Sequence, residues 1–451
     1  MSTVDILPPS VRRETTAVVR LAAGILAAVG FYLAGTAWNT AATARPGDLL
    51  PYQALMRDRS PEEQRAFREI QEGLLEAERL RSVSGGWPSP AALADQGIPP
   101  FAADPTRKIS YSWTATQRGV FANYRGTPSV VGAPAWLLLV QEPDRNAPPD
   151  PSPLGEGHHR LADGTLLHVS IWIHPNGAEL PPRLVSLPET EGWTQLLANP
   201  PGAGPRSSRL SQAGSWLFSS ASSFMTGMTG MTTALAAQAA PSPLKIGVTL
   251  HPYYSWTKNI VGNLPGYEVR SILPGEIDAG DYQPRPEDVR KLADLDAIVI
   301  NGIGHDDFIL PMIKASGNTK AVVIRPNDQS PQIRQVRGGA VNSHTFISFT
   351  NAIQQTYAIE RAIAALRPRD GEALQKNAAD YARRLRVIKA AAAAKLAEAT
   401  QTRVVTVHDG YGYLLQEFGL EVAGVVQPAH GLTPSAVELR QMVAVLQRER
   451  I

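Results

Sequence analysis

The feature that most constrains the fold is a long helical pattern between two histidines in the second half of the chain. It begins just after His344, is interrupted at residues 367–371, continues to about residue 400, and is followed by a short β run that ends at His408. Because a helix rises about 1.5 Å per residue, we expect a long, rigid spacer that ties two lobes of a small domain together. One imidazole from each lobe would then face a shared cleft that closes on a metal ion.

Strands and helices alternate through residues 244–451. Apolar β runs lie at 244–250, 267–273, 297–300, 320–325, 403–407 and 421–426. Helical patterns begin near residue 254 and cover residues 286–293, 308–315, 411–418 and 434–447. This alternation predicts α/β lobes with parallel sheets. The chain contains no cysteine, so a transition-metal site would have to use histidine, aspartate or glutamate.

Five short motifs in this half match one known family in order and spacing. They are a strand that leads through an aromatic-Pro step into a helix, an acidic segment that ends in Tyr-x-Pro, an Asn-Gly-x-Gly turn, an Asn-x-His at the head of the long helical pattern, and a His-Asp-x-Tyr-Gly-Tyr after the next strand. They occupy residues 249–254, 278–284, 301–304, 342–344 and 408–413. This half therefore resembles the periplasmic metal-binding proteins of zinc and manganese ABC importers, in the cluster with a long backbone helix.

The resemblance implies two α/β lobes that hold Zn²⁺, with Mn²⁺ second, and an ABC importer permease as the partner. Matched residue by residue, it transfers only His344 and His408 as metal ligands. The histidine of the family's first lobe aligns with Gly280. The family's final strands, which carry an acidic fourth ligand, have no counterpart before Ile451. We therefore expect an incomplete second lobe, in which the two histidines could also be relics of a lost site.

Other side chains could complete the ligand shell. In open α/β sheets, ligands gather beyond the carboxyl ends of the strands. His251 and His305 follow two of the predicted strands and rank first, and Asp281 and His430 rank behind them. Imidazole and carboxylate groups suit tetrahedral Zn²⁺ at about 2.0–2.2 Å. For each histidine the alternative is a hydrogen-bonded loop residue without a ligand role.

Residues 1–50 are predicted to be a tail and a transmembrane anchor. Arg12, Arg13 and Arg20 precede an uncharged stretch, residues 21–38. Together with the apolar residues before Arg20, the run reaches about 20 residues, which is enough to span ~30 Å of hydrocarbon. The basic residues on its N-terminal side predict that the rest of the chain is exported. We expect a single-pass inner-membrane protein with its bulk in the periplasm. The alternative is a signal peptide that is cleaved near residues 41–44.

Residues 51–195 are predicted to form a small exported α+β domain. Ser60, Pro61 and Glu63 fit a capping box at the start of a helix that runs to about Ser82. Short β runs at 109–114, 120–124, 136–140 and 165–174 predict an antiparallel sheet. This layout resembles type IV pilins and pseudopilins, although it lacks a prepilin cleavage signature. It also resembles an uncharacterised anchored domain that occurs beside zinc-uptake genes.

Residues 196–243 are predicted to be a linker that resembles an internal signal peptide. After a Pro/Gly-rich start come Arg206 and Arg209, a middle in which Ser, Thr and Gly dilute the apolar residues, and Ala-Gln-Ala at 237–239. This order predicts the fusion of an anchored domain with a protein that once carried its own signal. We expect a loose tether outside the membrane, and cleavage near residue 240 remains open.

The chain as a whole indicates binding and not catalysis. A net charge of +2 without a basic block gives no nucleic-acid signal. The sequence has no phosphate-binding Gly-rich loop, no nucleophile elbow and no His-Glu-x-x-His helix, so we expect no enzyme. Two functions remain. One is a membrane-anchored periplasmic component that captures Zn²⁺ for an ABC importer. The other is a non-catalytic accessory or assembly protein of metal uptake, whose metal site has degenerated.

Overall fold

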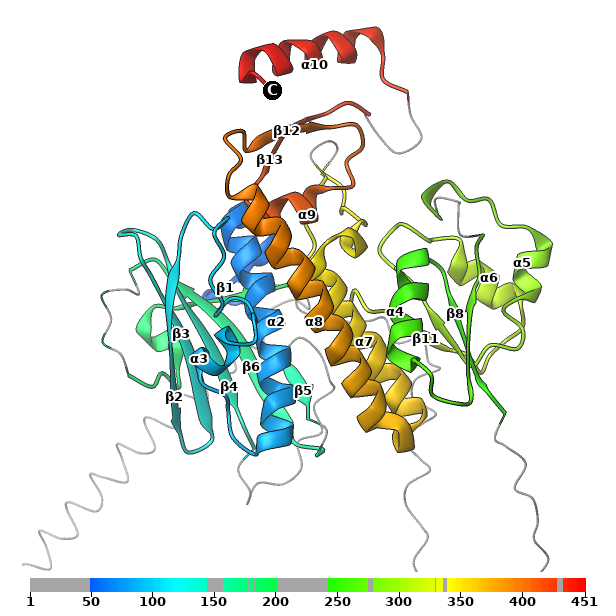
Figure 1. The fold of residues 1–451 in the computed structure, drawn as a ribbon, viewed down its shortest axis with the longest axis horizontal. Coiled ribbons are helices and arrows are strands. Elements are labelled where there is room, and N and C mark those ends of the chain that lie inside the picture. Colours follow the sequence, from blue (N-terminus) through cyan, green and yellow to red (C-terminus); the bar gives the residue numbers. More distant parts are fainter. Residues whose placement is uncertain are drawn as a thin grey trace, which may run out of the picture. The chain divides into compact units, whose positions relative to one another are not determined.

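The first half of the molecule is one long helix packed on one sheet (Figure 1). The computed structural model describes residues 49–143, 157–161, 163–176, 179, 181, 183–200, 242–274, 279–328, 330–335, 339–427 and 433–451. Among them, a seven-stranded sheet has the order β1-β7-β6-β4-β3-β2, and β5 pairs with β6. Its strands are β1 (Gln53–Leu55), β2 (Tyr111–Arg118), β3 (Phe121–Pro128), β4 (Ala135–Gln141), β5 (His158–Arg160), β6 (Leu166–His174) and β7 (Thr194–Leu197). The helices are α2 (Pro61–Ser84) and the short α3 (Pro90–Ala94).

Local sequence fixes both ends of α2. The Ser60 hydroxyl accepts a hydrogen bond from the Glu63 amide, and the Glu63 carboxylate accepts one from the Ser60 amide at 3.0 Å. These two bonds form the predicted capping box, which satisfies donors that the first helical turn leaves open. The helix ends at Gly85, whose positive φ of 77° is easy only for a residue without a side chain.

One face of α2 is apolar and lies on the sheet. Phe67, Ile70, Leu74 and Ala77 are buried in a common core with strand residues. Along β6, Leu167, Val169, Ile171 and Ile173 face this helix, and Trp172 points to the opposite side. The predicted antiparallel sheet is confirmed, except that β1 pairs with β7 in parallel. The sequence patterns did not predict the short strands β1, β5 and β7.

The second half contains a parallel sheet with helices, as predicted. The sheet has the order β11-β10-β8-β9, and all three pairings are parallel. Its elements are β8 (Leu244–Val248), α4 (His251–Val261), β9 (Tyr267–Ser271), α5 (Pro286–Arg290), β10 (Ala297–Val299), α6 (Ile309–Ala315) and β11 (Val322–Ile324). Residues 297–300 are wholly buried, which explains why this inner strand is purely apolar.

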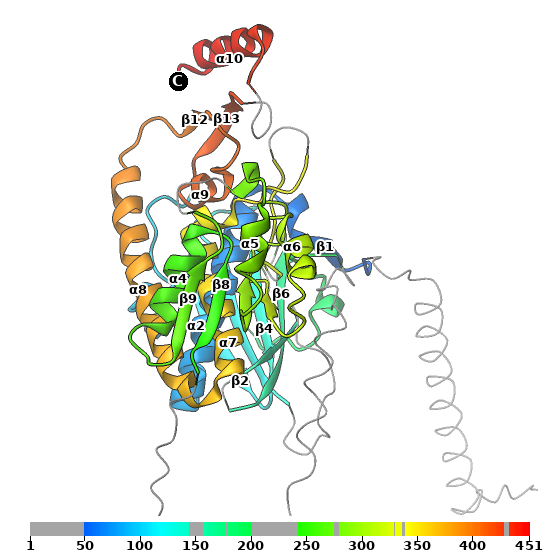
Figure 2. The same cartoon turned by 90° about the vertical axis from the view of Figure 1, so that its right-hand side faces the viewer.

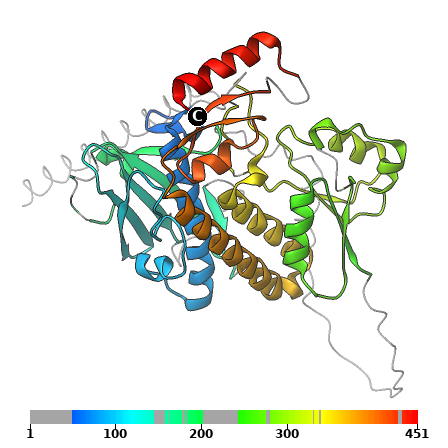
Figure 3. The ribbon, with the colours of Figure 1, turned by 45° about the horizontal axis from the view of Figure 1, so that its top comes forward.

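The long helical pattern forms a helical hairpin, not an extended spacer. It consists of α7 (Phe349–Leu366), a 3₁₀ turn (Pro368–Asp370) and α8 (Gly371–Leu396). The Lys389 ammonium near the end of α8 donates to the hydroxyl of Thr350 at the start of α7, at 2.9 Å, so the two helices run antiparallel and side by side (Figures 1 and 3). Because Pro368 lacks an amide hydrogen, it favours a turn at this point. The segments before α7 and after α8 therefore meet at the same end of the hairpin.

The chain that follows α8 forms a smaller lobe. Its elements are β12 (Arg403–Thr406), α9 (Gly412–Glu417), β13 (Glu421–Val425) and α10 (Ala436–Glu449). β12 and β13 pair in parallel, side by side, and α10 is the last helix of the chain (Figure 2). Met442 of α10 packs against Gly424 of β13. The predicted mixed α/β class with parallel sheets is thus confirmed for the second half of the chain.

Tyr52–Asn199 and the described residues from 242 onward belong to one compact unit. Within it, the second face of α2 packs against the helical hairpin. The Arg386 guanidinium of α8 contacts the carboxylates of Glu72 and Glu76 at 2.7 and 2.6 Å. The Tyr357 hydroxyl of α7 donates to Glu76 at 2.5 Å.

The predicted anchor at residues 21–38 and nearly all of the predicted linker lie outside the described residues, so both remain predictions. Among the helices that the structure describes, none combines the length and apolarity of a membrane span.

Candidate metal centre

His344 and His408 meet directly. Their Nε2 atoms are 3.0 Å apart, and their ring centroids are separated by 4.8 Å. The other ring nitrogen of each histidine faces an amide oxygen: Nδ1 of His344 lies 3.0 Å from Asn342 Oδ1, and Nδ1 of His408 lies 3.1 Å from Gln427 Oε1. His344 is buried and His408 is half-buried. The structure therefore brings together the two histidines that the sequence placed first.

Hydrogen bonds to Asn342 decide which nitrogen of His344 carries the proton. The Asn342 Oδ1 atom also accepts the backbone amide of His344, and its Nδ2 group donates to the Asp409 carbonyl at 2.9 Å. Because Oδ1 is an acceptor, the neutral His344 ring must donate from Nδ1, and its Nε2 lone pair points at His408. The Gln427 oxygen orients His408 in the same way. Two lone pairs that face each other repel, so this arrangement favours a proton or a metal cation between them.

Parallel strand ends place His408 beside Gln427. Thr406 of β12 is in register with Val425 of β13, and the backbone amide of Gln427 donates to the Val407 carbonyl at 2.8 Å. Each polar residue thus follows its strand at the same distance, at the sheet edge where ligand-binding residues gather. Sequence reasoning missed Gln427, and this equivalence with His408 was the signal that could have found it.

A glycine and a tyrosine of the 408–413 motif hold the two segments together. A Cβ atom at Gly410 would lie 2.9 Å from His408 Cδ2 and 3.1 Å from His344 Cδ2, so only glycine lets both rings come this close. The buried Tyr413 hydroxyl donates to the Asn342 carbonyl at 2.9 Å and accepts the Ile333 amide at 3.0 Å. Burial raises the pKa of Tyr413 to about 12, so this donor stays protonated at ordinary pH.

A third imidazole, His305, packs on this pair, and together His305, His344 and His408 form the histidine cluster. His305 is buried, and its centroid lies 4.9 Å from that of His344. The buried carboxylate of Asp306 fixes the turn that carries His305. It accepts hydrogen bonds from the Thr249 hydroxyl at 2.6 Å and from the backbone amides of Asn301 and Gly302 at 2.7 and 2.9 Å. Asp306 therefore has a structural role in this turn.

Amide side chains connect the first lobe to the histidine segment. The Asn301 amide donates to the Ser343 carbonyl at 3.1 Å, and Asn327 Oδ1 accepts the Thr345 hydroxyl at 2.8 Å. Both amides also donate to the hydroxyl oxygen of Tyr253, whose pKa is raised by burial. This network is neutral, so it orients the rings without supplying a counter-charge.

The other predicted ligands lie elsewhere or outside the described residues. His251 is exposed at the first residue of α4, and its ring stands 6.3 Å from Tyr254 of the same helix. Gly280, at the position of the family's histidine, lies in the 3₁₀ turn Ala279–Asp281. The side chain of Asp281 and the whole of His430 fall outside the described residues. Within the described part of the chain, no three His, Cys, Asp or Glu side chains already stand in a geometry that would hold an ion.

Comparison with known proteins separates the two halves. Residues 246–451 match the family "Zinc-uptake complex component A periplasmic", and residues 53–200 match a family of unknown function, DUF6162. The C-terminal region, residues 246–451, therefore carries a domain that matches the zinc-uptake component A family.

Individual relatives match the same part of the chain. The zinc-binding protein AdcA of Streptococcus pyogenes is 22% identical over 231 residues, which cover 46% of this chain and 44% of AdcA. The zinc-uptake protein ZnuA of Bacillus subtilis is 23% identical over 223 residues, covering 46% of this chain and 68% of ZnuA. A solved structure of FpvC from P. aeruginosa in complex with Ni²⁺ shares 42% identity, with a TM-score of 0.43, and the match covers 47% of this chain and 76% of FpvC. The chain thus spans less than half the length of the AdcA protein that it matches.

Proposed function

We propose that this chain is a solute-binding component that captures a divalent metal ion as cargo, foremost Zn²⁺, and passes it to an ABC importer. The observation that carries the proposal is the pair of imidazoles at 3.0 Å, each oriented through Nδ1 by an amide oxygen. At a Zn–N distance of 2.0–2.1 Å, two ligands of a tetrahedral ion stand roughly 3.3 Å apart. A small opening of the pair would therefore admit the ion.

We assign His344 and His408 as ligands and His305 as the next candidate, because its ring already packs on His344. His251, Asp281 and His430 stay as candidates for the remaining positions. The names of AdcA and ZnuA, which describe zinc-binding and zinc-uptake proteins, support Zn²⁺ as the cargo ahead of Mn²⁺. Anchoring by residues 21–38, a periplasmic location and an importer permease as partner belong to the same proposal.

Metal binding by the purified full chain tests the proposal. Titration calorimetry with Zn²⁺ and then Mn²⁺, against a competing chelator, should give one tight zinc site. The variant with both His344→Ala and His408→Ala should lose it. Because imidazole must be neutral to bind a metal, the wild-type affinity should fall in acid.

His174→Ala is the matched control. This imidazole lies in β6 of the first half, where it contacts Trp193 and accepts the Asn176 amide, so its loss should leave zinc binding unchanged. Unaltered zinc stoichiometry in the double variant would refute the assigned ligands. A wild-type chain that binds neither metal would instead favour the accessory or assembly role.

A further inference from the structure

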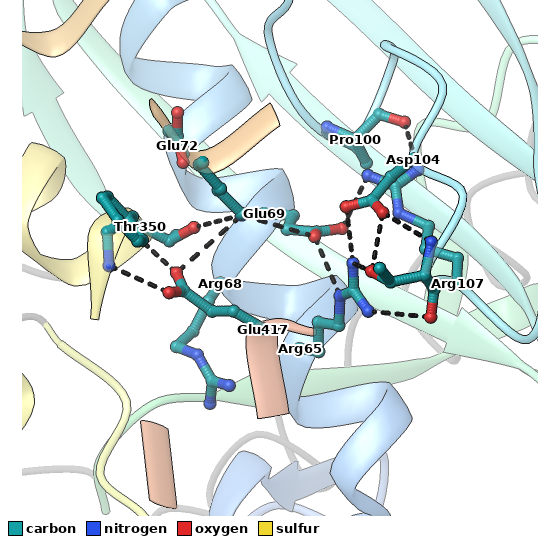
Figure 4. Close-up of polar contacts among 12 residues, drawn as sticks. Arg65, Arg68, Glu69, Glu72, Pro100, Asp104, Arg107, Thr350 and Glu417 are labelled. Carbon is teal, nitrogen blue, oxygen red and sulfur yellow. Dashed lines mark hydrogen bonds and ion pairs between the residues drawn. The ribbon is translucent and has the colours of Figure 1, made fainter. Parts of the chain in front are cut away.

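The two histidine-bearing segments are joined by a buried carboxylate that the site itself does not use. Glu417, the last residue of α9, accepts hydrogen bonds from the Ser348 hydroxyl at 3.0 Å and from the Phe349 and Thr350 amides at 2.9 and 2.6 Å (Figure 4). It therefore caps the N-terminus of α7, where a helix attracts negative charge. α7 begins shortly after His344, and α9 shortly follows His408, so this one carboxylate ties the two segments together.

The DUF6162-like half reaches the same point through α2. The Arg68 guanidinium donates to the Gln416 side chain, next to Glu417, at 2.9 Å, and lies 5.8 Å from the centre of the Tyr413 ring. The Lys389 ammonium stands 3.8 Å from both Glu69 of α2 and Glu417. The close approach continues at Gly419, where a Cβ atom would lie 2.8 Å from the Thr106 carbonyl.

Arg68 is poorly satisfied for a residue that is only 1% exposed. Among the described residues, its Nε and Nη1 atoms have no hydrogen-bond partner. A buried guanidinium with one hydrogen bond is costly to the fold. Its one bond goes to the helix that carries Tyr413, which in turn holds Asn342 beside His344. Continuous contacts therefore connect α2 with both histidine-bearing segments.

We propose that Arg68 and Glu417 are positioning residues for the histidine pair: the first half of the chain, docked through α2 on α9, sets the separation and orientation of His344 and His408. This inference rests on the proposed function for its metal readout. It assigns the DUF6162-like half a part in tuning metal affinity, in addition to any role in anchoring.

The test compares full-length variants under conditions in which each is folded. Glu417→Gln and Arg68→Met should weaken Co²⁺ and Zn²⁺ binding about tenfold and should change the intensity of the Co²⁺ ligand-field bands, which report ligand geometry. Gln416→Ala is a milder variant that should change the same readouts about threefold. Val140→Ala, in the buried core of the sheet, is the control. It should lower the unfolding midpoint but leave affinity and spectrum unchanged.

A metal-free readout separates this inference from the proposed function. In the apo-protein, the imidazole ¹⁵N signals of His344 and His408 should shift in Glu417→Gln and Gln416→Ala but not in Val140→Ala. Folded Glu417→Gln and Gln416→Ala variants with wild-type affinity, spectrum and imidazole signals would overturn the inference. If the wild-type chain bound no metal, the proposed function would fail, and the apo-protein signals alone would still decide the role of Glu417.

Discussion

The histidine cluster and the α2 interface are both buried and polar, but they are held by different kinds of groups. Around His344 and His408 the partners are neutral amides and a tyrosine. Between α2 and the helical hairpin the partners are full charges. Burial alone would raise the pKa of Glu69 on α2, but Arg107 and Arg65 of the first half, together with Lys389 of α8, outweigh burial and lower that pKa to about 2.

The difference shows what each cluster does. Opposite charges at the interface compensate each other inside the chain, so the interface serves docking. Amides orient the imidazoles without adding charge, so the two facing Nε2 lone pairs remain to be satisfied by a proton or a metal cation. Perturbing the charges between α2 and the helical hairpin should therefore act first on stability. Perturbing the histidine cluster, or the contacts of Arg68 and Glu417 with the segments that carry it, should act on metal affinity.

The largest effect is expected for Arg386→Ala. It leaves Glu72 and Glu76 buried without their shared guanidinium, which should lower the free energy of unfolding by about 3–5 kcal/mol. Arg383→Ala removes a similar but exposed residue, which pairs with Asp380, and should cost less than about 1 kcal/mol. Urea unfolding of both variants measures the contrast. Equal losses of stability in the two variants would show that Glu72 and Glu76 find other compensation when Arg386 is removed.

Glu360→Gln tests, through pH, what a buried carboxylate of α7 costs the fold. Burial raises the pKa of Glu360 to about 7 from an ordinary value of 4.5. Between these values the unfolded chain ionises and the folded chain does not, so wild-type stability should fall as pH rises from 4.5 to 7 and level off above it. The Glu360→Gln variant should lack this loss. Its free energy of unfolding should exceed that of the wild type by about 3 kcal/mol at pH 8 and should differ little at pH 4.

Glu360 and Glu372 both border a cavity of about 680 Å³, but Glu372 is exposed. Glu372→Gln is therefore the control. Unfolding of both variants should be followed at pH 4 and pH 8. An unchanged pH dependence in Glu360→Gln would mean that Glu360 ionises in the folded protein as it does in water.

Gly410→Ala tests the packing of the cluster. The new methyl group would press on both imidazoles. It should cost about 1–3 kcal/mol of folding free energy and should weaken zinc binding by a comparable free energy. Gly86→Ala adds a methyl group where nothing lies within 4 Å and should change neither. Calorimetry that shows full zinc affinity in Gly410→Ala would argue against a tightly set pair.

The smallest effect is expected for Gln427→Ala, which removes only the amide that orients His408. Loss of such an outer partner typically weakens metal binding by about tenfold or more, with little change in stability because Gln427 is only half-buried. Gln401→Ala, at an exposed position, is the control. A chelator competition assay resolves the difference, and equal affinities would remove Gln427 from the site.

Much of the fold follows from local sequence. The Ser60–Glu63 pattern forms its capping box, the apolar run at 297–300 forms a buried strand, and the interruption near Pro368 separates two helices. Caps, periodicity and breakers act over a few residues, so they can be recognised without the rest of the chain. The choice of His344 and His408 as a pair was likewise available from their motifs.

Only the tertiary structure decided how these elements meet. The direction of α8 after the break, the pairing of His408 with Gln427 and the burial of the charged face of α2 all depend on residues far apart in the chain. Glu69, Glu72 and Glu76 look like a solvated helix face by sequence, because their partners Arg386 and Lys389 lie in another half of the molecule. A charged face can be buried only when opposite charges arrive from elsewhere, and no local pattern records that arrival.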